Sequence, residues 1–131
     1  AEADPAVSPT ELAFRDGRAS LRDGDFAAAA AQFARAIAAD PDAPLAEDAR
    51  YWRGVALARA GKSTAARAAL TDFLDRHPTS LRAGRAALVL GNLLVEAGDL
   101  DAARARYTDA GQDADAEIRA AARKALAALG G

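Results

Sequence analysis

The chain has 131 residues, of which 17 are basic and 19 acidic, giving a formal net charge of −2, and it contains no cysteine. A chain of this length is expected to form one domain, and mixed charges disfavour nucleic acid as a ligand. The lack of cysteine excludes disulfides, thiolate metal sites and a thiol nucleophile. No apolar run approaches the ~18 residues of a membrane-spanning helix, so we expect no direct membrane insertion.

The predicted elements are all helices, because alanine dominates the apolar residues and Gly and Pro punctuate them at regular places. Residues 1–8 show no periodicity and predict a flexible leader before a single domain over 9–131. Ser8 and Pro9 suit the first helical turn, while Pro41 and Pro78 follow expected helix ends. The expected helices cover 10–22, 26–39, 45–60, 63–76, 81–97, 100–110 and 114–129.

The same small and ring residues recur every 37 positions, which indicates a repeated pair of helices. Within each pair, a glycine on the first helix is expected to face an alanine on the second, so that the two backbones approach closely. These expected pairs are Gly17 with Ala29, Gly54 with Ala66 and Gly91 with Ala103. The other recurring sets are Gly24, Gly61 and Gly98, and Phe33, Leu70 and Tyr107.

The segment Gly61-Lys62-Ser63-Thr64 has the ending of a phosphate-binding loop, but the first glycine of that motif is replaced by Ala56. No β-strand is predicted before it, and the 37-residue register makes Gly61 a turn between two helices. We therefore expect no nucleotide and no other cofactor.

The register of Gly17, Gly24, Ala29, Phe33 and Pro41 resembles the tetratricopeptide repeat, and it returns in two further copies, although Asp115 replaces the proline in the third. The resemblance implies an all-α, right-handed superhelical α-solenoid. It would contain three helical hairpins, at about 10–43, 47–80 and 84–113, and a capping helix over 114–129. The period of 37, with "DARYWRG" at 48–54 and "FLDRHPTSLRA" at 73–83, is similar to periplasmic members associated with the Tol-Pal system and with outer-membrane barrel assembly. It implies a bacterial periplasm or cell envelope, with the cytoplasm as the alternative.

The resemblance also places a partner-binding groove on the first helix of each pair. Its large apolar row would serve an apolar segment, or would instead simply pack between neighbouring helices, as such rows often do. The neighbouring arginines and an amide would hold a peptide backbone or a carboxylate. The expected groove residues are Phe14, Arg18, Leu21, Arg22, Tyr51, Val55, Arg59, Arg85, Leu88, Asn92 and Val95.

No pattern in the sequence supports catalysis or a metal site. His77 is the only histidine and has no nucleophile or ligand at patterned spacing, so it is expected to end a helix. Asp113, Asp115 and Glu117 lack the glycine and the terminal glutamate of a calcium loop, and capping of the last helix is the expected use.

The sequence thus predicts a non-catalytic module or adaptor that binds a protein or peptide partner on its concave face. The alternative is a scaffold that forms a homo-oligomer through its convex face or terminal repeats. Either function depends on a surface, with no catalytic residue.

Overall fold

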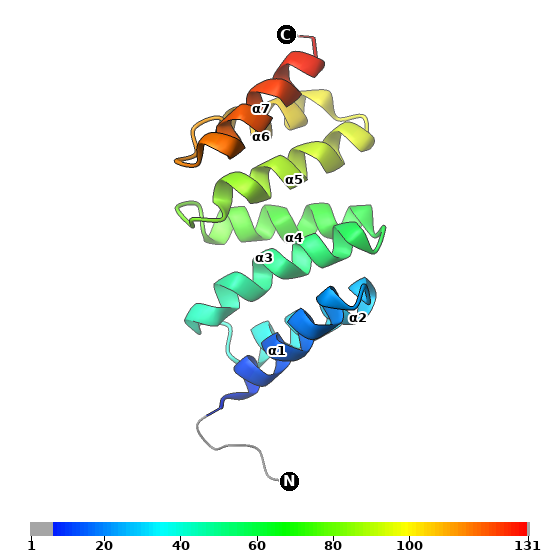
Figure 1. The fold of residues 1–131 in the computed structure, drawn as a ribbon, viewed down its shortest axis with the longest axis vertical. Coiled ribbons are helices and arrows are strands. Elements are labelled where there is room, and N and C mark those ends of the chain that lie inside the picture. The colour runs from blue at the N-terminus through cyan, green and yellow to red at the C-terminus, as the bar shows by residue number, and fades with distance from the viewer. Residues whose placement is uncertain (1–6, 131) are drawn as a thin grey trace. The chain divides into compact units, whose positions relative to one another are not determined.

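The computed structural model of the protein describes residues 7–130, and the regular structure in that range is entirely helical (Figure 1). This confirms the predicted all-α class. An α-solenoid is built from repeated pairs of helices of this kind. The predicted right-handed superhelix stays a prediction. The helices of the described range are α1 (Pro9–Arg22), α2 (Phe26–Ala39), α3 (Pro44–Arg59), α4 (Ser63–Arg76), α5 (Ala83–Glu96), α6 (Leu100–Ala110) and α7 (Ala116–Ala128).

Helix starts follow the caps that the sequence provides. The Ser8 hydroxyl accepts a hydrogen bond from the Glu11 N–H at 3.0 Å, and Pro9 takes the first helical position of α1. Most of the predicted leader falls on residues 1–6, outside the described range. Within that range, Ser8 is the residue that starts the fold.

Two predicted helices begin too early, since α5 begins at Ala83 and α7 at Ala116. Before α5, the Ser80 N–H bonds to the His77 carbonyl at 3.1 Å, and the Ala83 N–H bonds to the Ser80 carbonyl at 3.0 Å. These successive turns hold the backbone of residues 77–82 outside the helix, although Leu81 continues its apolar pattern.

The predicted glycine turns are confirmed. Gly24, Gly61 and Gly98 have φ values of 81°, 77° and 82°, a left-handed conformation that L side chains rarely adopt. A Cβ built at any of the three would have no atom within 4 Å. At these turns the backbone conformation, and not a lack of space, selects glycine.

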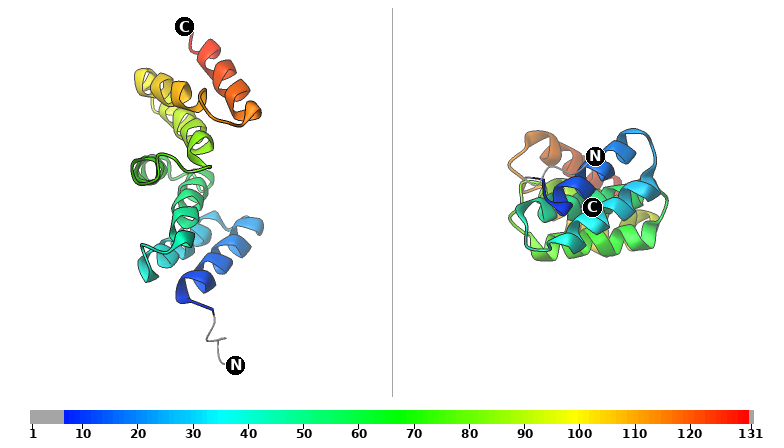
Figure 2. Two further views of the ribbon diagram at one scale, coloured as in Figure 1. Left: turned by 90° about the vertical axis from the view of Figure 1, so that its left-hand side faces the viewer. Right: turned by 90° about the horizontal axis from the view of Figure 1, so that it is seen from below.

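The helices pack into two compact units, Ala1–Ala69 and Leu70–Gly131, and the division falls inside α4. In unit 1, α1 packs against both α2 and α3, and α2 also contacts α3. In unit 2, α5 packs against α6, and α7 contacts both of them. Figures 1 and 2 show α1 beside α2, and α5 beside α6, as helices joined by a tight turn.

The core of unit 1 is built around Phe33, whose side chain is fully buried. The ring of Phe14 meets it edge-on, with 5.5 Å between the ring centroids. A Cβ added to Gly17 would lie 2.7 Å from the Phe33 ring. Nearby, the buried Thr10 hydroxyl donates to the Ala36 carbonyl at 2.9 Å, so α1 and α2 are also joined by a hydrogen bond.

Unit 2 has the same arrangement with different residues. A Cβ added to Gly91 would lie 2.5 Å from the buried ring of Tyr107. The predicted close approach of helices is therefore confirmed at Gly17 and Gly91, and the atoms nearest to these glycines belong to rings four residues beyond the predicted facing residues, Ala29 and Ala103. Side chains on a helix lean toward its N-terminus, so the ring four residues later covers the place opposite the glycine.

Candidate partner-binding surface

The residues predicted for the groove differ in exposure. The apolar members are covered, because Phe14, Val55 and Tyr51 are only 8%, 6% and 2% exposed. Leu21, Leu88 and Val95 are half-buried. The polar members lie on the surface, and they are Arg18, Arg22, Arg59, Arg85 and Asn92.

The large apolar row packs within the two units. Phe14 contacts the Phe33 ring, and the Tyr51 and Trp52 rings meet edge-on with 5.1 Å between centroids. Leu88 packs against the unit 2 core cluster, which consists of Ala87, Ala110, Ile118 and Ala122. These contacts support the alternative in which the row fills space between helices, and they leave little of it for a partner.

In unit 1, Arg18 and Arg22 lie four residues apart on α1 and therefore share a face of the helix. Both are exposed, and Arg22 is in the last helical turn, where the helix dipole favours a cation. Arg59, in the last turn of α3, places its guanidinium carbon 5.8 Å from the centroid of the Phe26 ring. Unit 1 thus presents exposed arginines on α1 and in the last turn of α3.

In unit 2, Arg85 and Asn92 are two helical turns apart on α5 and lie on one face. The Tyr107 hydroxyl donates to the Asn92 Oδ1 at 2.6 Å, which orients the Asn92 amide so that its N–H groups are donors toward a ligand. Burial raises the pKa of the Tyr107 hydroxyl above its ordinary value of 10.0. The neutral phenol is therefore the form that holds Asn92.

Removing that hydroxyl has a pH-dependent effect. We expect Tyr107→Phe to lower the free energy of unfolding by about 0.5–1.5 kcal/mol at neutral pH through the lost hydrogen bond. Because the folded-state pKa is raised, Tyr107 contributes stability that is fully present below pH ~10 and is lost as the pH rises through the folded value. Urea denaturation at neutral and alkaline pH should show the difference between the two proteins shrinking with pH. A difference that is constant across that window would contradict the assignment.

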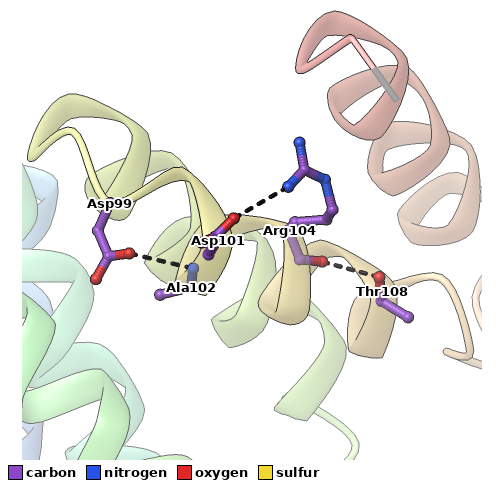
Figure 3. Close-up of polar contacts among 5 residues, drawn as sticks. All are labelled: Asp99, Asp101, Ala102, Arg104 and Thr108. Carbon is purple, nitrogen blue, oxygen red and sulfur yellow. Dashed lines mark hydrogen bonds and ion pairs between the residues drawn. The ribbon is translucent and has the colours of Figure 1, made fainter.

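Most of the charged side chains at the start of α6 form contacts within the helix or at its N-terminal cap (Figure 3). The Asp99 carboxylate accepts from the Ala102 N–H at 3.2 Å, and the guanidinium of Arg104 lies 3.3 Å from the Asp101 carboxylate. The Thr108 hydroxyl donates to the Arg104 carbonyl at 2.8 Å. Surface pairs of this kind contribute little to stability, and they make α6 a useful place for control substitutions.

The sequence reasoning missed a hollow of about 650 Å³ in unit 2. It lies between the turn before α5 and the turn before α7, and its lining includes Leu81, Arg106, Asp109 and Asp113. Leu81 was assigned to a helix in the sequence, whereas its side chain is 96% exposed in a turn. The sequence held no clear signal for the hollow, because a single exposed leucine is common on protein surfaces.

The acidic residues before α7 act as predicted. The Asp115 carboxylate accepts from the Glu117 N–H at 2.8 Å and caps the helix. Within residues 7–130, no group of three potential metal-binding side chains comes together. No helix in that range is both long and apolar enough to cross a membrane.

Comparison with protein families matched the tetratricopeptide repeat to residues 14–80 and again to residues 56–117. The two matches together cover more than half of the chain, and they overlap in the segment that contains part of α3 and all of α4. Comparison with curated proteins found no match.

Proposed function

Because the chain belongs to the tetratricopeptide repeat family, we propose that it is an adaptor that binds acidic segments of a partner protein, with one contact on α1 in unit 1 and a separate contact on α5 in unit 2. Repeats of this family generally mediate protein–protein interaction, and proteins made of them are typically non-catalytic. Exposed arginines on α1 and α5, each the first helix of a pair, would form ion pairs with carboxylates of the partner.

The observation that carries the proposal is the separation of polar from apolar residues on α1 and α5. The rings and most aliphatic groups of the predicted groove are covered, while Arg18, Arg22, Arg85 and Asn92 are exposed. Guanidinium groups bind carboxylates through paired hydrogen bonds, and an amide can hold a peptide backbone. A partner segment with carboxylates therefore fits these helices better than a purely apolar segment.

The test compares two variants in capture experiments with extract from the source organism. We expect the variant Arg18→Ala, Arg22→Ala, Arg85→Ala, Asn92→Ala to lose a partner that the unchanged protein retains. The matched control is Arg35→Ala with Arg123→Ala, which removes exposed arginines from α2 and α7. Circular dichroism should show that both variants stay folded, because none of the substituted side chains is buried. Equal retention by all three proteins would contradict the proposal.

A self-assembling scaffold is the second candidate, and it rests on leucines that stay open to solvent. Leu12 on α1 and Leu100 on α6 are 40% and 44% exposed. Sedimentation velocity over a range of concentrations separates the two functions, because a scaffold shifts to larger species as concentration rises and a monomeric adaptor does not.

The proposed location is the bacterial periplasm or cell envelope. It is supported only by the similarity of the 37-residue period and of the segments at 48–54 and 73–83 to envelope members of the family. Fractionation of cells that produce the natural protein with an epitope tag tests it, and recovery in the cytoplasm alone would contradict it.

A further inference from the structure

We propose that the hollow in unit 2 is a second interaction site, which binds a peptide segment that carries an arginine or lysine beside an apolar side chain. The site lies at the turns before α5 and α7 and shares no residue with the proposed surface on α1 and α5. It is therefore independent of the adaptor function, and each can fail without the other.

The size of the hollow suits a few side chains. Its volume of about 650 Å³ lies inside the roughly 300–1,000 Å³ typical of ligand pockets. Residues 78–81 form one wall, residues 112–115 form the opposite one, and Arg106 and Asp109 of α6 complete it. The lining thus combines an apolar side with a charged side.

The apolar side presents a leucine on a fixed backbone. Leu81 is 96% exposed, yet its turn is held by the bonds at Ser80 and by an N–H of Arg82 that donates to the Ser80 hydroxyl at 3.1 Å. Pro78 stiffens the same wall, and the half-buried Leu74 lies at the end of α4. Burying Leu81 against a partner's apolar side chain would be favourable, and the ordered turn would lose little conformational freedom on binding.

The charged side has an excess of carboxylates. Among the described residues that line the hollow, Asp109, Asp113 and Asp115 are acidic and Arg106 is basic. The Arg119 guanidinium adds a second positive charge behind this wall, where it donates to the Asp113 and Ala114 carbonyls at 2.9 and 2.8 Å, so one negative charge is left over. Arg106 and Asp109 are 4.0 Å apart, a distance at the limit of an ion pair, and 67% of the Asp109 side chain is exposed. This field attracts a cation and repels phosphate groups, which disfavours nucleic acid and anionic lipid as occupants.

The position of Asp113 is fixed by two neighbours. Its Oδ2 accepts from the Asp115 N–H at 2.9 Å, and its carboxylate lies against Gly84, where a Cβ would collide with it. The Asp115 Oδ1 is used by the Glu117 N–H, so Asp115 keeps one oxygen that the α7 cap does not use, whereas the second oxygen of Asp113, Oδ1, lies against Gly84. The cap therefore holds two carboxylates in place beside the hollow.

The carboxylates are spread along the wall and do not converge. No group of three metal-binding side chains forms within residues 7–130, and this disfavours a bound metal ion. A guanidinium or ammonium group on a flexible side chain can reach separate carboxylates, while its neighbour in the peptide reaches Leu81. This combination of contacts selects a basic and apolar peptide.

The test is a nuclear magnetic resonance titration of the ¹⁵N-labelled full chain with the blocked tripeptides acetyl-Leu-Arg-Leu-amide and acetyl-Leu-Glu-Leu-amide. We expect the arginine peptide to shift the amide signals of residues 78–84 and 109–115, and the glutamate peptide to leave them unchanged. Equal shifts with both peptides, shifts confined to other residues, or no shifts at all would overturn the proposal.

Variants then separate the two walls. Asp109→Asn should weaken binding of the arginine peptide by about three- to fivefold, the scale of one exposed ion pair. Leu81→Ser should weaken it by at least about as much, because the partner's apolar side chain loses the surface that it would cover. The matched control Asp101→Asn changes a fully exposed carboxylate of the same helix and should leave the affinity unchanged. An equal loss in the control would show non-specific charge attraction and would overturn the proposal.

Discussion

Replacing Phe33 by alanine is expected to lower the free energy of unfolding by about 3–5 kcal/mol. The ring is fully buried between α1 and α2, where it contacts Phe14 and fills the space that Gly17 leaves open. Alanine would leave a cavity that these backbones cannot close, because the hydrogen bond from Thr10 to Ala36 also fixes their spacing. Urea denaturation followed by circular dichroism measures the loss.

The control is Phe26→Ala, which removes a ring that is only half-buried and lies beneath the Arg59 guanidinium. Its loss should be clearly smaller, since less apolar surface returns to water. If the two variants unfolded at the same urea concentration, the assignment of Phe33 as the centre of the unit 1 core would be wrong.

Replacing Gly91 by leucine should destabilise unit 2, by about 1–3 kcal/mol or more. The first added carbon would lie 2.5 Å from the Tyr107 ring, and the rest of the side chain has to enter the same space between α5 and α6. In a helix, leucine is more favourable than glycine by up to ~1 kcal/mol. The free-energy cost of the collision must therefore exceed that gain for the variant to be less stable than the unchanged protein. The midpoint of thermal unfolding is the measurement.

Two comparisons identify the collision as the cause. Ala105→Leu places the same side chain on the exposed face of α6 and should change the midpoint little. Tyr107→Ala destabilises the protein by itself. In the protein that carries Tyr107→Ala, however, Gly91→Leu should lower the midpoint much less than it does in the unchanged protein. Additive losses in the double variant would mean that the glycine and the ring do not interact.

The helices could be predicted because their boundaries are set by neighbours in sequence. Ser8 and Pro9 start α1, and the glycine turns fix where α2, α4 and α6 begin. The first turns of α5 and α7 were harder, because Leu81 and Ala114 look helical in composition. Before α5 the backbone is held by turn hydrogen bonds that the residue pattern does not predict, whereas the predicted cap Asp115 sets the start of α7.

The candidate site was less predictable, because exposure depends on which helices cover a face. The repeat register placed Phe14 and Tyr51 on the first helices, but burial arises from packing within each unit, to which α1, α2 and α3 all contribute. The hollow in unit 2 joins residues that are about thirty positions apart, such as Leu81 and Asp113. Periodicity alone does not indicate that two turns meet.

Glycine is required in this chain for two opposite reasons. At Gly17 and Gly91 the backbone is ordinary helix, and what is lacking is room for any side chain. At Gly24 and Gly98 there is ample room, and what excludes other residues is the chirality of an L-amino acid. A residue of mirror-image configuration would therefore suit the turns, where an L-residue does not. The hairpin thus places one steric and one stereochemical constraint seven residues apart.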